Sequence, residues 1–142
     1  MSDPRVFVAV TTDPIDVAAL AARVARPAAG AMATFVGTVR DASHGRRVLG
    51  IDYEAYEPMA LRVLERIGDE MCAEWPVAAA ALVHRLGRLD VGDASFAIVV
   101  ATPHRADAFA ALRHGIEAVK RDLPVWKKER FEDGSVWVQE GS

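Results

Sequence analysis

The chain has a single cysteine, Cys72, among its 142 residues, and no apolar run in it is long enough to cross a bilayer. One cysteine excludes an internal disulfide framework and any metal site built from several thiolates. The first five residues, Met-Ser-Asp-Pro-Arg, do not show the pattern of a signal peptide. These absences lead us to expect a cytoplasmic protein that has no membrane partner.

Motifs for nucleotide binding and for nucleophilic catalysis are also missing. The chain contains no G-x-G-x-x-G, no G-x-x-x-x-G-K-[ST] and no G-x-S-x-G segment. Its four histidines, His44, His84, His104 and His114, lack the spacing of metal ligands. We therefore expect neither a metal nor a cofactor.

Composition and charge indicate one globular domain over residues 1–142. Apolar residues make up 51% of the chain and charged residues 26%, and the length is sufficient for one proper core. The net charge of −3 provides no overall positive field, so nucleic acid is not an expected partner. The cations are instead clustered, which points to a local site for an anion.

Hydrophobic periodicity predicts strands that alternate with helices. The expected strands cover residues 5–11, 31–40, 49–55, 77–86, 94–101, 125–131 and 136–138, and the expected helices cover 14–25, 58–75 and 105–123. The order βαββαββαββ is typical of an α+β fold with a mostly antiparallel sheet covered by helices. We expect strand 49–55 to form a hairpin with strand 31–40, and Gly37 to mark a bulge or a close approach of backbone to a ligand.

The most informative segment runs from residue 117 to residue 131. Pro124 ends the third helix, and the chain resumes as a strand in which Lys127 shares a face with apolar residues. At roughly 100° per residue, Lys120 falls on the buried edge of the apolar stripe of that helix. The stripe consists of Phe109, Leu112, Ile116, Val119 and Leu123.

Lys120 has two interpretations. A lysine on an apolar stripe commonly extends its stem so that the ammonium reaches water. It can also be a partly desolvated amine with a lowered pKa, suited to proton transfer or nucleophilic attack. A helix end and a strand start that meet at Pro124 can direct Lys120 and Lys127 into one pocket, which favours the second interpretation.

Further cations stand where elements end. Arg40 closes the strand 31–40, and His104 with Arg105 stands at the start of the third helix, where free N–H groups and the helix dipole favour an anion. Together with Lys120, Lys127 and Lys128, these residues predict a cationic pocket for phosphate or carboxylate. The loop 41–47, with His44, Arg46 and Arg47, is expected to be a mobile, solvated connection.

Several segments are similar to one known family. They are Phe35-Val36-Gly37-Thr38-Val39-Arg40, Tyr53-Glu54-Ala55-Tyr56, His84-Arg85-Leu86-Gly87, Pro103-His104-Arg105-Ala106-Asp107-Ala108-Phe109, and Lys120 followed by Pro124-Val125-Trp126-Lys127-Lys128-Glu129. In this order, over nearly the whole chain, they resemble the catalytic (large) subunit of molybdopterin synthase.

The resemblance implies an α/β-hammerhead fold and a sulfurtransferase activity. It implies that cyclic pyranopterin monophosphate becomes molybdopterin with sulfur from the C-terminal Gly-Gly thiocarboxylate of a small ubiquitin-like subunit. It also implies a central homodimer with one small subunit at each end, a heterotetramer. By motif, Lys120 and Lys127 correspond to the catalytic lysines. The residues that correspond to the substrate and tail pocket are Thr38, Val39, Arg40, His104, Arg105, Lys128 and Glu129.

Two other functions fit the residues. Lys120 could form a Schiff base with a phosphorylated carbonyl compound. Alternatively, the chain could hold a ubiquitin-like tail without performing any chemistry on it. Product formation from pyranopterin and a thiocarboxylated small subunit separates both alternatives from the sulfurtransferase.

Overall fold

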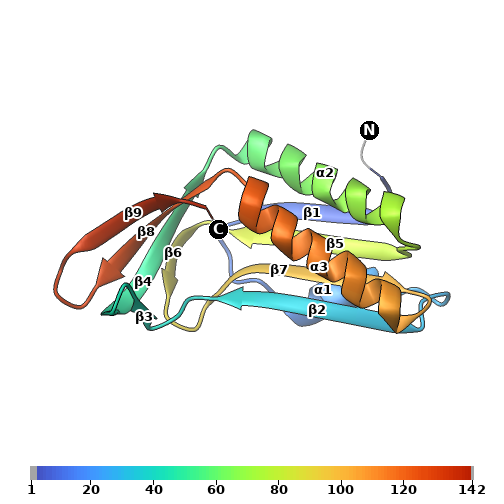
Figure 1. The fold of residues 1–142 in the computed structure, drawn as a ribbon, viewed down its shortest axis with the longest axis horizontal. Helices are drawn as coiled ribbons and strands as arrows, with labels where there is room; N and C mark the ends of the chain where they lie inside the picture. The colour runs from blue at the N-terminus through green and yellow to red at the C-terminus, as the bar shows by residue number, and fades with distance from the viewer. Residues whose placement is uncertain (1–2, 142) are drawn as a thin grey trace.

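A four-stranded sheet forms the body of the molecule. The computed structural model describes residues 3–141, so residues 1–2 and 142 of the predicted domain lie outside the described part. The strand order is β1 (Val6–Thr11), β5 (Ala79–Arg85), β7 (Ala94–Thr102) and β2 (Ala31–Thr38). Helices α2 (Glu57–Glu74) and α3 (Arg105–Asp122) cover one face of this sheet, and α1 (Val17–Val24) lies against the other (Figure 1).

Two apolar layers hold the sheet between its helices. Because side chains alternate along a strand, Leu82 and Ile98 join the core under α2 and α3, whereas Ala81 and Val99 join a smaller core under α1. The central strands β5 and β7 are buried along nearly their whole length. The main sheet is therefore a rigid support for whatever lies at its ends.

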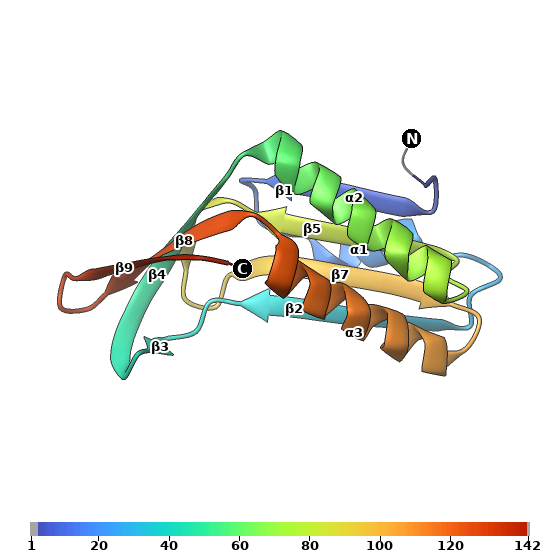
Figure 2. The ribbon, with the colours of Figure 1, turned by 45° about the horizontal axis from the view of Figure 1, so that its top comes forward.

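A second sheet stands at one end of the first (Figures 1 and 2). Its strand order is β3 (Ala42–Ser43), β4 (Arg46–Ala55), β8 (Val125–Phe131) and β9 (Val136–Glu140), and the short β6 (Gly87–Asp90) also pairs with β4. The hairpin β8–β9 follows α3 directly. The C-terminal end of α3 is thereby placed beside this second sheet.

The structure confirms the predicted α+β class and corrects the strand pairing. Strand β2 pairs with β7, with Phe35 opposite Ile98, and β4 pairs with β8, with Tyr53 opposite Lys127. The expected hairpin between strands 31–40 and 49–55 is therefore wrong. The chain leaves the main sheet after β2, where Val39 donates to the Asp93 carbonyl at 3.0 Å, and enters the second sheet. The short strands β3 and β6 were not predicted.

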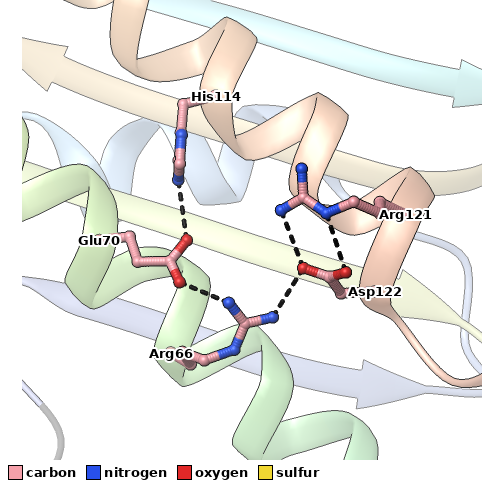
Figure 3. A network of polar contacts seen from close by, with 5 residues as sticks. All are labelled: Arg66, Glu70, His114, Arg121 and Asp122. Carbon is pink, nitrogen blue, oxygen red and sulfur yellow. Dashed lines mark hydrogen bonds and ion pairs between the residues drawn. The ribbon is translucent and has the colours of Figure 1, made fainter.

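Helices α2 and α3 are joined at their surface by a network of charged side chains (Figure 3). Arg66 on α2 binds Glu70 on the same helix and Asp122 of α3, the latter at 2.9 Å, and His114 lies 2.9 Å from Glu70. These side chains are partly exposed, so each pair contributes at most about 1 kcal/mol. Packing of the apolar core sets the position of α3, and the network only reinforces it.

No helix in the described part of the chain is long and apolar enough to cross a membrane.

Helix α1 begins later than expected from the sequence. Asp16, rather than Asp13, is its N-cap, because the Asp16 side chain accepts a hydrogen bond from the Ala19 backbone N–H.

Candidate active site

A cavity of about 130 Å³ opens where the end of the main sheet meets the second sheet. Its wall is built from β2 and the turn after it, from β3, β4 and β8, from the start of β7, and from the last turn of α3. The lining residues are Gly37, Thr38, Arg40, Ala42, Ser43, Val48, Ile51, Tyr53, Ser95, Lys120, Lys127 and Glu129. Segments that are far apart in the sequence thus converge on one small, polar space.

Both predicted lysines line this cavity. Lys120 reaches it from the last turn of α3, and Lys127 reaches it from the third position of β8, after the chain has turned at Pro124. The arrangement expected from the proline bend is therefore present within a single chain. Their roles in catalysis stay a prediction.

The surroundings of Lys120 differ in part from the expectation. Lys120 is exposed as a residue, and Phe109, placed by the helical wheel on the same apolar stripe, is 67% exposed. The ammonium nevertheless lies over the Phe96 ring, 5.1 Å from its centre. The stripe prediction is thus wrong at Phe109, and Lys120 lies at the mouth of the cavity rather than in the core.

The pKa of Lys120 is lowered from its ordinary value of 10.5. Partial burial of the ammonium is the largest cause, and the positive charges of Lys127 and Arg40 add to it. The pKa depends only on the surroundings of the ammonium. The exposure of the residue also counts its long aliphatic stem, so an exposed lysine can have a partly buried ammonium. Lys120 therefore has the environment of a group that exchanges protons more easily than a surface lysine.

Glu129 places one negative charge among these cations. It is 4% exposed, and its Oε1 lies 3.9 Å from Nζ of Lys127, an ion pair that is too long for a hydrogen bond. Its other oxygen, Oε2, has no hydrogen-bond partner among the described residues. Lys127 and Glu129 share the inner face of β8 because they are two residues apart.

Arg40 and Thr38 enter the cavity wall at the end of β2. The pairing of β2 with β7 shifts its register between Gly37 and Thr38, which confirms the bulge predicted at Gly37. A side chain at Gly37 would lie 2.9 Å from the Phe96 ring, so only glycine lets the backbone pass there. The bulge redirects the chain so that Arg40 reaches the cavity.

Buried aromatic residues form the floor behind the cations, and sequence reasoning did not assign them to the site. The ring of His84 is fully buried, stacks on Phe96 at 5.9 Å and meets the edge of Tyr53 at 5.0 Å. Burial raises the pKa of Tyr53, which hydrogen bonds with Ser95, and Glu129 raises it further. Two motifs in the sequence, His84-Arg85-Leu86-Gly87 and Tyr53-Glu54-Ala55-Tyr56, contain residues of this floor.

His84 is expected to make the protein less stable in mild acid. Burial lowers the pKa of His84 from 6.5 to about 4, and the positive charge of Lys120 contributes to this lowering. The hydrogen bond that Nδ1 donates to the Arg85 carbonyl acts in the opposite direction. Between these two values the unfolded chain binds a proton that the folded chain does not, so stability falls as the pH falls. The loss in the free energy of unfolding approaches about 3 kcal/mol near pH 4.

Urea unfolding at several pH values between 4 and 7 would measure this loss. In a His84→Phe variant, which keeps a ring in the stack, the free energy of unfolding should change less over the same range. Ring proton resonances that show His84 charged at pH 6 in the folded protein would contradict the prediction.

Four predicted pocket residues lie outside the cavity of their own chain. Val39 is 3% exposed and packs in the core, and Lys128 points to the opposite face of β8 from Lys127. His104 and Arg105 are exposed at the first turn of α3. Arg105 is roughly 22 Å from Lys120 along the helix, because an α-helix rises about 1.5 Å per residue. The first turn of α3 is the end of the helix that lies far from the second sheet (Figure 1).

The described residues contain no cluster of histidine, cysteine and carboxylate side chains that could hold a metal ion. The cavity offers instead an arginine and two lysines that can neutralise an anion, an amine with a lowered pKa, and a buried carboxylate. Such a set suits the binding of phosphate or carboxylate and a proton transfer close to them.

Comparison with known proteins identifies the family. A family model described as "MoaE protein" matches residues 10–122. The molybdopterin synthase catalytic subunit of Halalkalibacterium halodurans is 46% identical over 92% of this chain and 83% of its own length.

Solved structures agree with the sequence comparison. The crystal structure of molybdopterin synthase from Staphylococcus aureus superimposes with a TM-score of 0.87 at 37% identity, covering 92% of this chain and 94% of that one. A complex of subunits 1 and 2 of the molybdopterin-converting factor from Helicobacter pylori has the same fold, with a TM-score of 0.72 at 22% identity over 90% of this chain and 86% of that one.

The fold is that of an enzyme class, the molybdopterin synthases. The chain belongs to the MoaE family, the catalytic subunits of molybdopterin synthase, which act in molybdenum cofactor biosynthesis.

Proposed function

We propose that the cavity transfers sulfur from the thiocarboxylate tail of a small ubiquitin-like subunit to cyclic pyranopterin monophosphate. The single observation that carries the proposal is the convergence of Lys120, Lys127 and Arg40 on one space of about 130 Å³. Both reactants are anions, because one carries a phosphate and the other a thiocarboxylate. Converging cations can bind both and stabilise the charge that develops during transfer.

Each transfer would proceed in two steps. The tail sulfur attacks a side-chain carbon of the pterin and displaces an oxygen substituent, so a C–S bond forms as a C–O bond breaks and the leaving oxygen takes up a proton. The sulfur is at this stage still bonded to the acyl carbon of the tail. Water then attacks that acyl carbon and releases the tail as a carboxylate, leaving the sulfur on the pterin. A second round at the neighbouring carbon completes the dithiolene.

The two lysines are suited to different tasks. Lys120, whose pKa is lowered by burial and by neighbouring charges, would transfer the proton or activate the tail carbonyl. Lys127, beside Glu129, would stabilise the negative charge that develops. Arg40 would hold the phosphate, as guanidinium groups do well.

His104 and Arg105 require a second copy of the chain if they serve this chemistry. They lie at the far end of α3 from their own cavity, so we propose that each contributes to the cavity of its partner in a homodimer. Exposed apolar side chains support a contact near this edge: Met32 and Val36 on the edge strand β2, and Phe109 on α3, which packs against β2. The Helicobacter pylori complex of subunits 1 and 2 supports a small partner subunit.

The test is reconstitution from purified components. The chain, a thiocarboxylated small subunit and cyclic pyranopterin monophosphate should together form molybdopterin, and a small subunit that ends in an ordinary carboxylate should not support the reaction. Binding of the small subunit without product formation would contradict the proposal and favour a binding module. Trapping of Lys120 on a phosphorylated carbonyl substrate by borohydride would favour a Schiff-base enzyme instead.

A further inference from the structure

Trp137 lies on the cavity side of the hairpin β8–β9. It is the cross-strand partner of Glu129, and Gln139 is the partner of Lys127. Paired residues in adjacent strands point to the same face, so Trp137 and Gln139 extend the face on which Glu129 and Lys127 line the cavity. The indole Nε1–H donates to Oε1 of Gln139 at 2.9 Å, which fixes the ring, yet 45% of Trp137 is exposed.

His44 meets this indole from the opposite side of the cavity rim. The two ring centres are 4.8 Å apart, with 43° between the planes. His44 has a left-handed backbone, φ 52°, and Gly45 follows it with φ 70°, which closes the tight β3–β4 turn. Its neighbour Ser43 lines the cavity. The loop expected to be a mobile connection thus presents an aromatic ring to the rim.

The size of the cavity leaves part of the substrate outside. A pocket that encloses a small organic ligand usually measures ≈ 300–1,000 Å³, and this cavity measures about 130 Å³. Arg40, Lys120 and Lys127 account for the phosphate and the reacting carbons of the proposed substrate. Its fused ring system, with the aromatic pyrimidine at the far end, then extends past the rim, where Trp137 and His44 lie.

We propose that Trp137, together with His44, forms a stacking wall that binds the flat pyrimidine ring of the pterin while the cations bind its phosphate. This inference rests on the proposed function and adds the residues that select a ring-bearing phosphate. A flat pyrimidine ring can stack on an indole, as nucleobases stack on aromatic side chains in other proteins. Trp137 is then a substrate-binding residue that touches the substrate away from the reacting carbons.

The test compares two exposed tryptophans of the same hairpin. Trp137→Leu keeps apolar bulk without a π-face, and Trp137→Phe keeps a smaller ring. Trp126→Leu is the matched control, because Trp126 is 52% exposed but points away from the cavity face of β8. Trp137→Leu should raise KM for pyranopterin monophosphate roughly tenfold or more with little change in kcat, and Trp137→Phe should recover most of the loss.

A binding measurement separates this inference from the sulfur-transfer proposal. In the Trp126→Leu protein, pyranopterin monophosphate should quench indole fluorescence, and inorganic phosphate at the same concentration should not. The additional replacement Trp137→Phe should abolish that quenching. These readouts need neither turnover nor the small subunit, so they stand even if reconstitution yields no product.

Three results would overturn the stacking wall. The first is an unchanged KM in a folded Trp137→Leu protein, and the second is equal quenching with and without Trp137. The third is weaker binding of the small subunit to Trp137→Leu with no change in KM for the pterin, because it would assign the wall to the tail of the small subunit.

Discussion

Replacing Lys120 by alanine is expected to slow molybdopterin formation by about two to four orders of magnitude, the usual contribution of a positioned proton-transfer group. The expectation follows from its place at the cavity mouth, its ammonium over Phe96 and its lowered pKa. Single-turnover assays with a preformed complex of enzyme, thiocarboxylated small subunit and pterin would measure the chemical step separately from binding.

Two further variants make the Lys120 experiment specific. Arg121→Ala removes the adjacent cation, which is paired with Asp122 and does not line the cavity, so its rate should match that of the unmodified protein. Lys120→Arg keeps a positive charge but offers a guanidinium that stays protonated. If Lys120 transfers a proton, Lys120→Arg should be nearly as slow as Lys120→Ala. A normal rate for Lys120→Ala would refute the assignment.

The pH dependence of the rate should reveal how the cations influence one another. Because Lys127 and Arg40 lower the pKa of Lys120, removing either charge should raise that pKa toward 10.5. If protonated Lys120 acts as the acid, the rate falls as the pH rises through its pKa. That decline should therefore occur at higher pH in the residual activity of Lys127→Met and Arg40→Met than in the unmodified protein.

The sequence was sufficient to locate the two lysines because the relevant geometry is local. Pro124 ends α3, four residues after Lys120 and three before Lys127, and a helix end followed at once by a strand leaves few ways to separate the two ammonium groups. The bulge at Gly37 was predictable for the same reason, since a glycine within a strand pattern is itself a local signal.

Pairing between distant strands could not be read from local patterns. Strands 31–38 and 46–55 both alternate, and nothing in their periodicity states that β2 pairs with β7 while β4 pairs with β8. The aromatic floor formed by His84, Phe96 and Tyr53 depends on that pairing, so it became visible only in the fold. The same holds for Trp137 and His44, which lie 93 residues apart (137 − 44) and meet across the second sheet.

The proposed contribution of Arg105 to the cavity of the partner chain can be tested by mixing two inactive variants. A chain carrying Lys120→Ala keeps Arg105, and a chain carrying Arg105→Ala keeps Lys120; each variant alone should be nearly inactive. In a mixed dimer, the cavity that retains Lys120 receives Arg105 from its partner. Random mixing of equal amounts makes half of the dimers mixed, each with one complete site of two. Activity should therefore return to about a quarter of the unmodified level.

The control for this experiment is a pair of variants on the same cavity. Chains carrying Lys120→Ala and Lys127→Ala should not complement each other, because both lysines line the cavity of their own chain and no mixed dimer then contains a complete site. If Arg105 acted on its own cavity, mixing Lys120→Ala with Arg105→Ala would likewise restore nothing. The roughly 22 Å between Arg105 and Lys120 along α3 makes that second outcome hard to reconcile with a rigid helix packed along the main sheet.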